Sequence, residues 1–244
     1  MGIRRGEITT KIVSDGLIFN MDAANRASTI PSTSTLKTFN TIDLSQFGSI
    51  ITDSTWEDGT PPTFNFDGTD GYISLPDQIP PRFVTTSNAT EGGQFKPWSV
   101  GIWTKFTAVN QNLLQFVFGG AAGVYTFQLA YYSSKVHFGH RYTILREETN
   151  STVININEWN YIFLTKDGSI SSSDSYKLYI NGNNIDHTTS GHWGTNNSGK
   201  NDLGRAFTSV YTTGDISALH MYTKALSAAE VLSNYNGLRG RFGV

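Results

Sequence analysis

The sequence of 244 residues contains no cysteine. A disulfide scaffold, a thiolate zinc site and a cysteine nucleophile are therefore excluded. Charged residues are also scarce, at 16%, and the 18 Lys and Arg nearly balance the 20 Asp and Glu, which leaves a net charge of −2. A protein that coats nucleic acid is usually far more basic, so we expect no nucleic-acid partner.

Long apolar segments are missing as well. No run of roughly 18 apolar residues occurs, so we expect no insertion into a membrane. Residues 1–11 are polar and contain Arg4 and Arg5 with no apolar stretch behind them, which is unlike a signal peptide. We therefore expect a protein that is made in a cytoplasm and not secreted.

Small polar residues are abundant, with 24 Ser, 29 Thr and 19 Asn beside 24 Gly. This composition is typical of short strands joined by many turns rather than of long helices. Residues 99–106 alternate, with Val100 and Ile102 on one face and Trp103 on the other. Residues 161–166 are nearly all apolar, which predicts a strand buried on both faces. Asn181-Gly182 predicts a tight hairpin turn between strands 176–180 and 183–186.

The remaining segments divide into loops and one helix. Residues 25–62 and 187–202 look polar and irregular. Ser227, followed three residues later by Glu230, forms a capping-box pattern and predicts a short helix that ends near Asn236-Gly237. We predict an all-β fold, a two-sheet antiparallel jelly-roll sandwich over residues 12–236, with an N-terminal arm (1–11) and a basic C-terminal tail (237–244).

Five motifs then resemble those of the concanavalin A-like, laminin-G-like jelly rolls. Residues 66–73 resemble F-D-G-x-D-x-Y-V, residues 99–105 resemble S-x-S-x-W-x-K, and residues 158–169 resemble W-H-x-V followed by D-G-S. Residues 176–182 are similar to x-x-L-Y-V-N-G, and residues 214–231 to the family's C-terminal strand and helix start. The resemblance implies a concanavalin A-like fold, which hosts lectins, glucanases and structural modules alike.

The two ends resemble a narrower group. Residues 11–25 are similar to the K-I-V-x-D-G-L start, and residues 233–243 to the N-Y-N…G-R-F-G finish, of virion structural proteins of tailed bacteriophages. This resemblance implies a complete small virion protein, located in the virion after synthesis in the host cytoplasm. Its partners would be the major capsid protein or tail components, and copies of the chain could also associate with one another.

An enzymatic role is not expected. A glucanase on this fold carries Glu-x-Asp-x-x-Glu, and none of the seven Glu forms that pattern. Glu147 and Glu148 are adjacent, so on a strand they point to opposite faces, and we interpret them as a solvated pair beside Arg146. His137, His140, His187 and His192 are interpreted as ordinary surface residues.

No metal or other cofactor is expected either. Many relatives hold calcium with acidic side chains, but two acids of the family's C-terminal motif are replaced by Ser217 and Ala218. Asp67 and Asp70 are better explained as turn residues, because Asp bonds to nearby backbone in turns.

We therefore predict a non-enzymatic virion protein, a capsid decoration protein or otherwise a tail, neck or fibre component, that docks on a repeated protein lattice. Docking through the ends would use the four arginines Arg4, Arg5, Arg239 and Arg241. The alternative is a virion-displayed lectin or adhesin that binds host-surface glycans. The aromatic residues considered for glycan or partner contact are Trp56, Tyr131, Tyr132 and Trp193.

Overall fold

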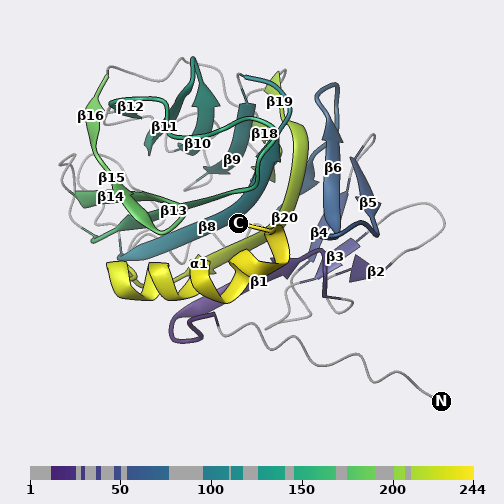
Figure 1. Ribbon diagram of the computed structural model, residues 1–244, viewed down its shortest axis with the longest axis horizontal. Helices are drawn as coiled ribbons and strands as arrows, with labels where there is room; N and C mark the ends of the chain where they lie inside the picture. The colour runs from purple at the N-terminus through teal and green to yellow at the C-terminus, as the bar shows by residue number, and fades with distance from the viewer. Residues whose placement is uncertain are drawn as a thin grey trace.

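In the part of the chain that the structure describes, the fold consists of two large antiparallel sheets, a two-stranded sheet and one helix (Figure 1). The computed structural model describes residues 12–25, 29–30, 37–39, 47–50, 54–76, 96–109, 111–117, 126–140, 146–168, 175–190, 201–206 and 210–244. Within these segments, no helix has both the length and the apolar character needed to cross a membrane.

The first sheet has eight strands. In spatial order they are β15 (Asn183–Ile185), β14 (Tyr176–Ile180), β13 (Asn160–Lys166), β8 (Trp98–Phe106), β20 (Thr213–Tyr222), β6 (Thr63–Asp67) and β5 (Ser54–Glu57), with β1 (Leu17–Asp22) also paired to β20. The last long strand in the sequence, β20, therefore lies in the middle of this sheet.

The second sheet has ten strands. In spatial order they are β16 (His187–Thr189), β12 (Arg146–Thr149), β11 (Lys135–His140), β10 (Thr126–Tyr132), β9 (Gln111–Val117), β17 (Asp202–Leu203), β7 (Ile73–Ser74), β4 (Phe47–Ile50), β3 (Lys37–Phe39) and β2 (Thr29–Ile30). The strands β18 (Arg205–Ala206) and β19 (Val210–Tyr211) pair separately. The two-sheet antiparallel sandwich expected from the sequence is confirmed.

Two of the predicted loops contain strands. Segment 25–62 supplies β2 to β5, and segment 187–202 begins with β16. These strands are two to four residues long. Each forms because a neighbouring strand offers backbone partners, which a polar stretch does not reveal by its own pattern.

The main core lies between the two sheets, where alternating side chains meet. On β8, Val100, Ile102 and Phe106 face this core, while Trp103 faces the opposite layer. Every residue of β13 is buried, as predicted. The hairpin turn is also confirmed, because Asn181 and Gly182 have φ angles of 52° and 81°, the positive values that a two-residue turn of this type requires.

The helix α1 (Ala228–Phe242) covers the outer face of the eight-stranded sheet (Figure 1). Its capping box at Ser227 and Glu230 is present as predicted. The predicted end near Asn236-Gly237 is wrong, because the helix continues to Phe242 and is capped by Gly243 at φ 72°. Residues 237–242 are therefore helical, and they do not form the separate tail expected from the sequence.

A second apolar layer holds the helix against the sheet. The ring of Phe242 stacks on that of Trp103, with centroids 4.0 Å apart and planes 11° apart. Val231 and Leu238 are buried in the same layer, at 0% and 1% exposure. Their spacing places them on one face of the helix, which explains why the helix runs past the two glycines at 237 and 240.

Candidate functional site

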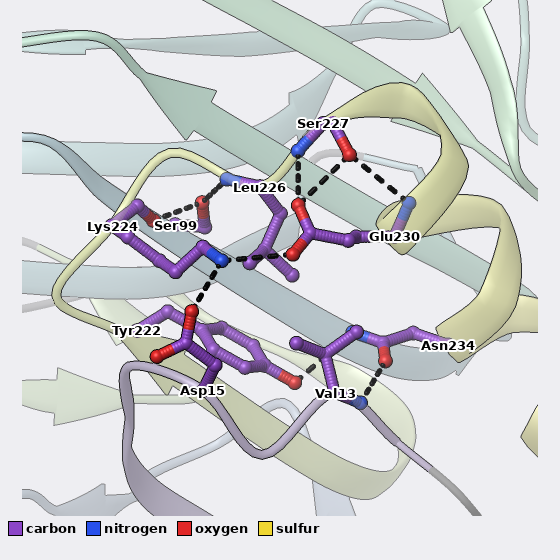
Figure 2. A network of polar contacts seen from close by, with 9 residues as sticks. All are labelled: Val13, Asp15, Ser99, Tyr222, Lys224, Leu226, Ser227, Glu230 and Asn234. Carbon is purple, nitrogen blue, oxygen red and sulfur yellow. Dashed lines mark hydrogen bonds and ion pairs between the residues drawn. The ribbon is translucent and has the colours of Figure 1, made fainter.

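The two terminal motifs meet in a polar network between β1, β20 and α1, which we call the terminal clamp (Figure 2). The Asn234 side chain lies at its centre. Its Oδ1 accepts a hydrogen bond from the Val13 amide at 2.7 Å, and its Nδ2 donates to the Tyr222 hydroxyl at 3.0 Å. One buried amide thus joins segments that are 221 positions apart in the sequence.

Lys224 bridges the two halves of the clamp. Its Nζ lies 2.7 Å from Asp15 and 2.8 Å from Glu230 (Figure 2). The bonds from Lys224 and from the amide and hydroxyl of Ser227 lower the pKa of Glu230 to about 2. The carboxylate therefore stays ionised across the physiological range and keeps the start of the helix tied to the N-terminal segment.

The predicted docking arginines have different surroundings. Nη1 of Arg241 donates to both oxygens of Asp22, at 2.9 and 2.8 Å, and both side chains are nearly buried. Arg241 thus has a partner within the chain and serves the terminal clamp. Arg239 lies on the exposed side of the helix, with its guanidinium 5.8 Å from the Tyr235 ring centroid. Arg4 and Arg5 lie outside the described residues.

The predicted aromatic contacts are also scattered. Tyr131 is 1% exposed and packs on Phe106, so the expectation of an exposed ring there is wrong. Trp56 is partly buried, and its Nε1 donates to the carbonyl of Ala23 at 3.0 Å. Tyr132 is 51% exposed, whereas Trp193 lies outside the described residues. Among the described residues of this set, Trp56 lies on β5 of the eight-stranded sheet and Tyr132 on β10 of the ten-stranded sheet, so these two do not share a strand or a sheet.

Glu147 is not the solvated residue expected from the sequence. It is 1% exposed and faces the core side of β12. Thr189 donates to its Oε1 at 2.9 Å, and Nδ1 of His187 lies 3.2 Å from its Oε2. The other ring nitrogen of His187 faces the carbonyl of Tyr176 at 3.2 Å and must donate, since a carbonyl only accepts.

Glu148 points to the opposite face, as its adjacency to Glu147 predicts. Its Oε1 lies 2.7 Å from Nζ of Lys135, and this bond is the main cause of its lowered pKa. Nδ1 of His137 lies 3.6 Å from the other oxygen. His137 is 3% exposed, so the interpretation as a surface histidine is wrong for it.

The described acidic residues offer no obvious metal centre. No group of three or more potential ligands is found among them. Asp215 is bonded to Lys105 at 2.9 Å and to Asn65 at 2.9 Å. The Asp67 side chain accepts a bond from the Thr69 amide at 2.8 Å, which agrees with its interpretation as a turn residue.

A pocket of about 430 Å³ opens at one edge of the eight-stranded sheet, between the β14–β15 hairpin, β16 and the first helical residue, Ala228. We call it the hairpin pocket. Its lining includes Tyr176, Tyr179, Ile185 and His187. Tyr179 belongs to the layer under the helix, whereas Tyr176 and Ile185 pack on the core between the sheets.

The polar groups of the hairpin pocket come from its rim. Lys177, Asn184 and Asp186 are exposed and line the same space. Sequence reasoning found this hairpin from Asn181-Gly182 but assigned it no function. The signal was the row of polar residues on a strand next to a predicted turn, and the missing information was the helix that closes the space.

The comparisons with known proteins agree with the fold. The profile of the concanavalin A-like lectin/glucanases superfamily matches residues 67–232. No curated protein sequence matches the chain significantly. The profile match confirms the family that the internal motifs indicated.

Solved structures share the fold at low identity. The binding domain of Paraclostridial Mosquitocidal Protein 1 superposes with a TM-score of 0.60 at 14% identity, over 91% of this chain and 52% of that one. A sialidase from Trypanosoma rangeli superposes with a TM-score of 0.57 at 11% identity, over 90% of this chain and 32% of that one. Domain 4 of an extracellular arabinanase from Geobacillus stearothermophilus, solved with arabinotriose, has a TM-score of 0.55 at 16% identity, over 90% of this chain and 98% of that one. The chain spans about half of the first protein and a third of the second.

Proposed function

Because the chain belongs to the concanavalin A-like lectin/glucanases superfamily, whose jelly roll serves binding as well as catalysis, we propose that it is a non-catalytic binding protein of a tailed-phage virion. It docks on a repeated protein lattice, as a capsid decoration protein or otherwise as a tail, neck or fibre component.

The observation that carries the virion proposal is the terminal clamp. The start and finish motifs that resemble phage virion proteins supply Val13 and Asp22 on one side and Asn234 and Arg241 on the other. Because Val13 binds Asn234 and Asp22 binds Arg241, the two motifs form one structural unit, which supports reading them together.

The state of the carboxylates supports a non-catalytic role. A glycosidase needs two carboxyl groups that face a shared space beside the substrate. Glu147 and Glu148 face opposite sides of β12, and each is held by partners within the chain. Asp202 and Asp215 are likewise paired, with Arg205 and Lys105.

Reconstitution on particles tests the proposal. Virions of the phage that carries this gene are prepared without the protein, and purified protein is added before sedimentation. We expect saturable binding at a fixed number of copies per particle, and no release of reducing ends from host polysaccharides. Absence of binding to particles, together with absence of the protein from wild-type virions by mass spectrometry, would contradict the virion proposal.

Variants in the same assay test the ends. Arg4→Ala with Arg5→Ala, and separately Arg239→Ala, remove predicted docking charges without touching the described core. Arg241→Ala is unsuitable, because it breaks the pair with Asp22 and changes stability at the same time. Normal incorporation of both sets of variants would move the docking surface away from the ends.

The hairpin pocket favours a second candidate, a virion-displayed lectin that binds host-surface glycans. Trp56, Tyr132 and Trp193 remain candidate contacts for such a ligand, although the pocket lies at a different place on the chain. Binding of the purified protein to host cells, and its loss after enzymatic removal of surface polysaccharide, would support this candidate.

A further inference from the structure

The two sheets meet at one edge in a corner of a single residue. β15 is the end strand of the eight-stranded sheet and β16 is the end strand of the ten-stranded sheet, and only Asp186 lies between them in the chain (Figure 1). His187 is the first residue of β16, and its side chain is only 11% exposed. The ring contacts β12 in its own sheet and β14 in the other sheet, so it joins the two sheets beside the corner.

The ring of His187 faces two hydrogen-bond acceptors. Nδ1 lies 3.2 Å from Oε2 of Glu147, and Nε2 lies 3.2 Å from the carbonyl oxygen of Tyr176. A neutral imidazole has one N–H group and can donate to only one of these oxygens. Both contacts are hydrogen bonds when the pair of His187 and Glu147 holds one further proton, whether on Nδ1 or on the carboxyl group. Loss of that proton therefore removes the bond to Glu147, because the carbonyl accepts from the single N–H group that remains.

Glu147 has little access to a replacement donor. The residue is 1% exposed, and its other oxygen, Oε1, already accepts a hydrogen bond from Thr189 at 2.9 Å. A buried carboxylate oxygen that loses its donor keeps the cost of desolvation without a compensating bond. The loss of the proton therefore affects β12 and β16 together, because Glu147 and Thr189 are directly paired across these two strands.

The charged groups on the outer side of the ring are exposed. Asp186 at the corner and Lys177 on β14 line the hairpin pocket together with His187, and they are of opposite sign. Their effects on the ring are screened by solvent and oppose each other. Ala228, where the helix reaches the same pocket, carries no charge.

The inner side of the ring meets aromatic groups. The Phe138 ring on β11 lies edge-on to the His187 ring, with 5.0 Å between the centroids. Burial raises the pKa of the Tyr176 hydroxyl well above its usual value, so this group stays neutral. Nζ of Lys166 on β13 lies 4.6 Å from the Tyr176 ring centroid and 2.8 Å from Oγ of Ser175, so its charge is engaged by those two residues. Of the charged groups in the described segments, the Glu147 carboxylate is thus the one that contacts the ring directly.

We propose that the pair of His187 and Glu147 is a pH-sensitive fastener of this edge of the sandwich, closed while the pair holds the further proton and loosened when it loses that proton. Histidine is the side chain that ordinarily gains or loses a proton near neutral pH. Because the proton favours the fastened form, the edge becomes firmer as the pH falls and looser as the pH rises. The inference rests on neither the virion proposal nor the lectin candidate.

The opposite face of β12 carries a similar pair with an additional partner. Nε2 of His137 lies 2.9 Å from the carbonyl oxygen of Tyr132, and its Nδ1 lies 3.6 Å from Oε2 of Glu148. Nζ of Lys135 is bound to the other oxygen of Glu148 at 2.7 Å. Glu148 therefore keeps a donor whatever the protonation state of His137, which makes this pair a matched comparison on the same strand.

The test compares amide hydrogen exchange of the whole chain between about pH 6 and about pH 9, a range that spans the usual titration of histidine. The readout is the protection factor of the amides in the β12–β16 ladder, which is the exchange rate of an unfolded chain at the same pH divided by the measured rate. A charge-assisted hydrogen bond is roughly twice as strong as a neutral one, so wild-type protection should fall by about five- to tenfold as the pH rises across this range. The NMR signals of the His187 ring should titrate over the same interval.

Glu147→Gln removes the need for the proton. The amide oxygen of the new side chain can accept from Thr189 while its NH2 group donates to the neutral Nδ1 of His187, so protection should be independent of pH. His187→Gln removes the titrating ring and should also abolish the pH dependence, which keeps the test decisive if the first variant fails to fold. Glu148→Gln makes the same change on the opposite face of β12 and should keep the wild-type profile.

Three results would overturn the proposal. The first is wild-type protection of the β12–β16 ladder that stays constant with pH. The second is an unchanged pH dependence in Glu147→Gln or His187→Gln. The third is loss of the pH dependence in Glu148→Gln, which would assign the effect to the other face of the strand.

Discussion

Replacement of Phe242 by alanine tests whether the last turn of the helix belongs to the core. The ring is 6% exposed, stacks on Trp103 at 4.0 Å and lies 4.8 Å from Trp159. Truncation of a buried phenylalanine costs about 3–5 kcal/mol in free energy of unfolding. Because Phe242 lies in the last turn of the helix, that turn can relax around the shortened side chain, and we expect the lower end of this range.

A loss of about 3 kcal/mol corresponds to a fall in Tm of roughly 6–12 °C for a domain of this size. Urea unfolding measures the change in the free energy of unfolding directly. Tryptophan fluorescence is a suitable signal, because Trp103 is buried in the same layer as Phe242. Val244→Ala is the matched control, because Val244 is 44% exposed and its truncation should change stability by less than about 0.5 kcal/mol. Equal stability of Phe242→Ala and the control would refute the packing argument and restore the interpretation of residues 237–244 as a separate tail.

Three further outcomes follow from buried groups and from the acidic residues. Burial lowers the pKa of His220 to about 4, so NMR titration should show that its ring stays neutral well below pH 6. Between about pH 6.5 and 4 the unfolded chain binds a proton on this residue that the folded chain does not, so the free energy of unfolding should fall as the pH drops through that range. Burial likewise lowers the pKa of Lys166 to about 8, so between about pH 8 and 10.5 the unfolded chain binds more protons than the folded chain. The stability of the wild type relative to Lys166→Met, measured by denaturant titration, should therefore rise with pH across that window. A stability difference that does not change with pH would contradict the assignment. EDTA should change Tm by less than about 2 °C relative to 1 mM calcium, and a larger fall in calorimetry would reveal a structural ion.

The parts of the fold that the sequence predicted are those with strong local patterns. β13 is a continuous apolar run, the hairpin has the Asn-Gly pair that its turn geometry needs, and the capping box marks the start of the helix. The end of the helix was misjudged because Asn236-Gly237 looks like a helix stop. Leu238 and Phe242 continue the buried face, and the apolar layer on Trp103 outweighs the cost of glycine in the helix.

The candidate site was less predictable, because its residues depend on distant partners. Alternation on a strand showed that Glu147 and Glu148 diverge, but it could not show which of the two faces the core. Glu147 is buried because His187 and Thr189 reach it from a strand 40 positions away, in a segment whose composition suggested a loop. The hairpin pocket likewise depends on the approach of the helix to the β14–β15 edge, which no local pattern encodes.

The central position of β20 determines when this protein can fold during synthesis. Of the strands ordered along the eight-stranded sheet, β15, β14, β13 and β8 lie on one side of β20, and β6 and β5 lie on the other. A nascent chain on the ribosome therefore holds two unjoined half-sheets, each with an open hydrogen-bonding edge, until residue 222 has left the exit tunnel. Such edges are prone to pair with other chains. Protection of these open edges by chaperones until β20 is available should therefore raise the yield of native protein.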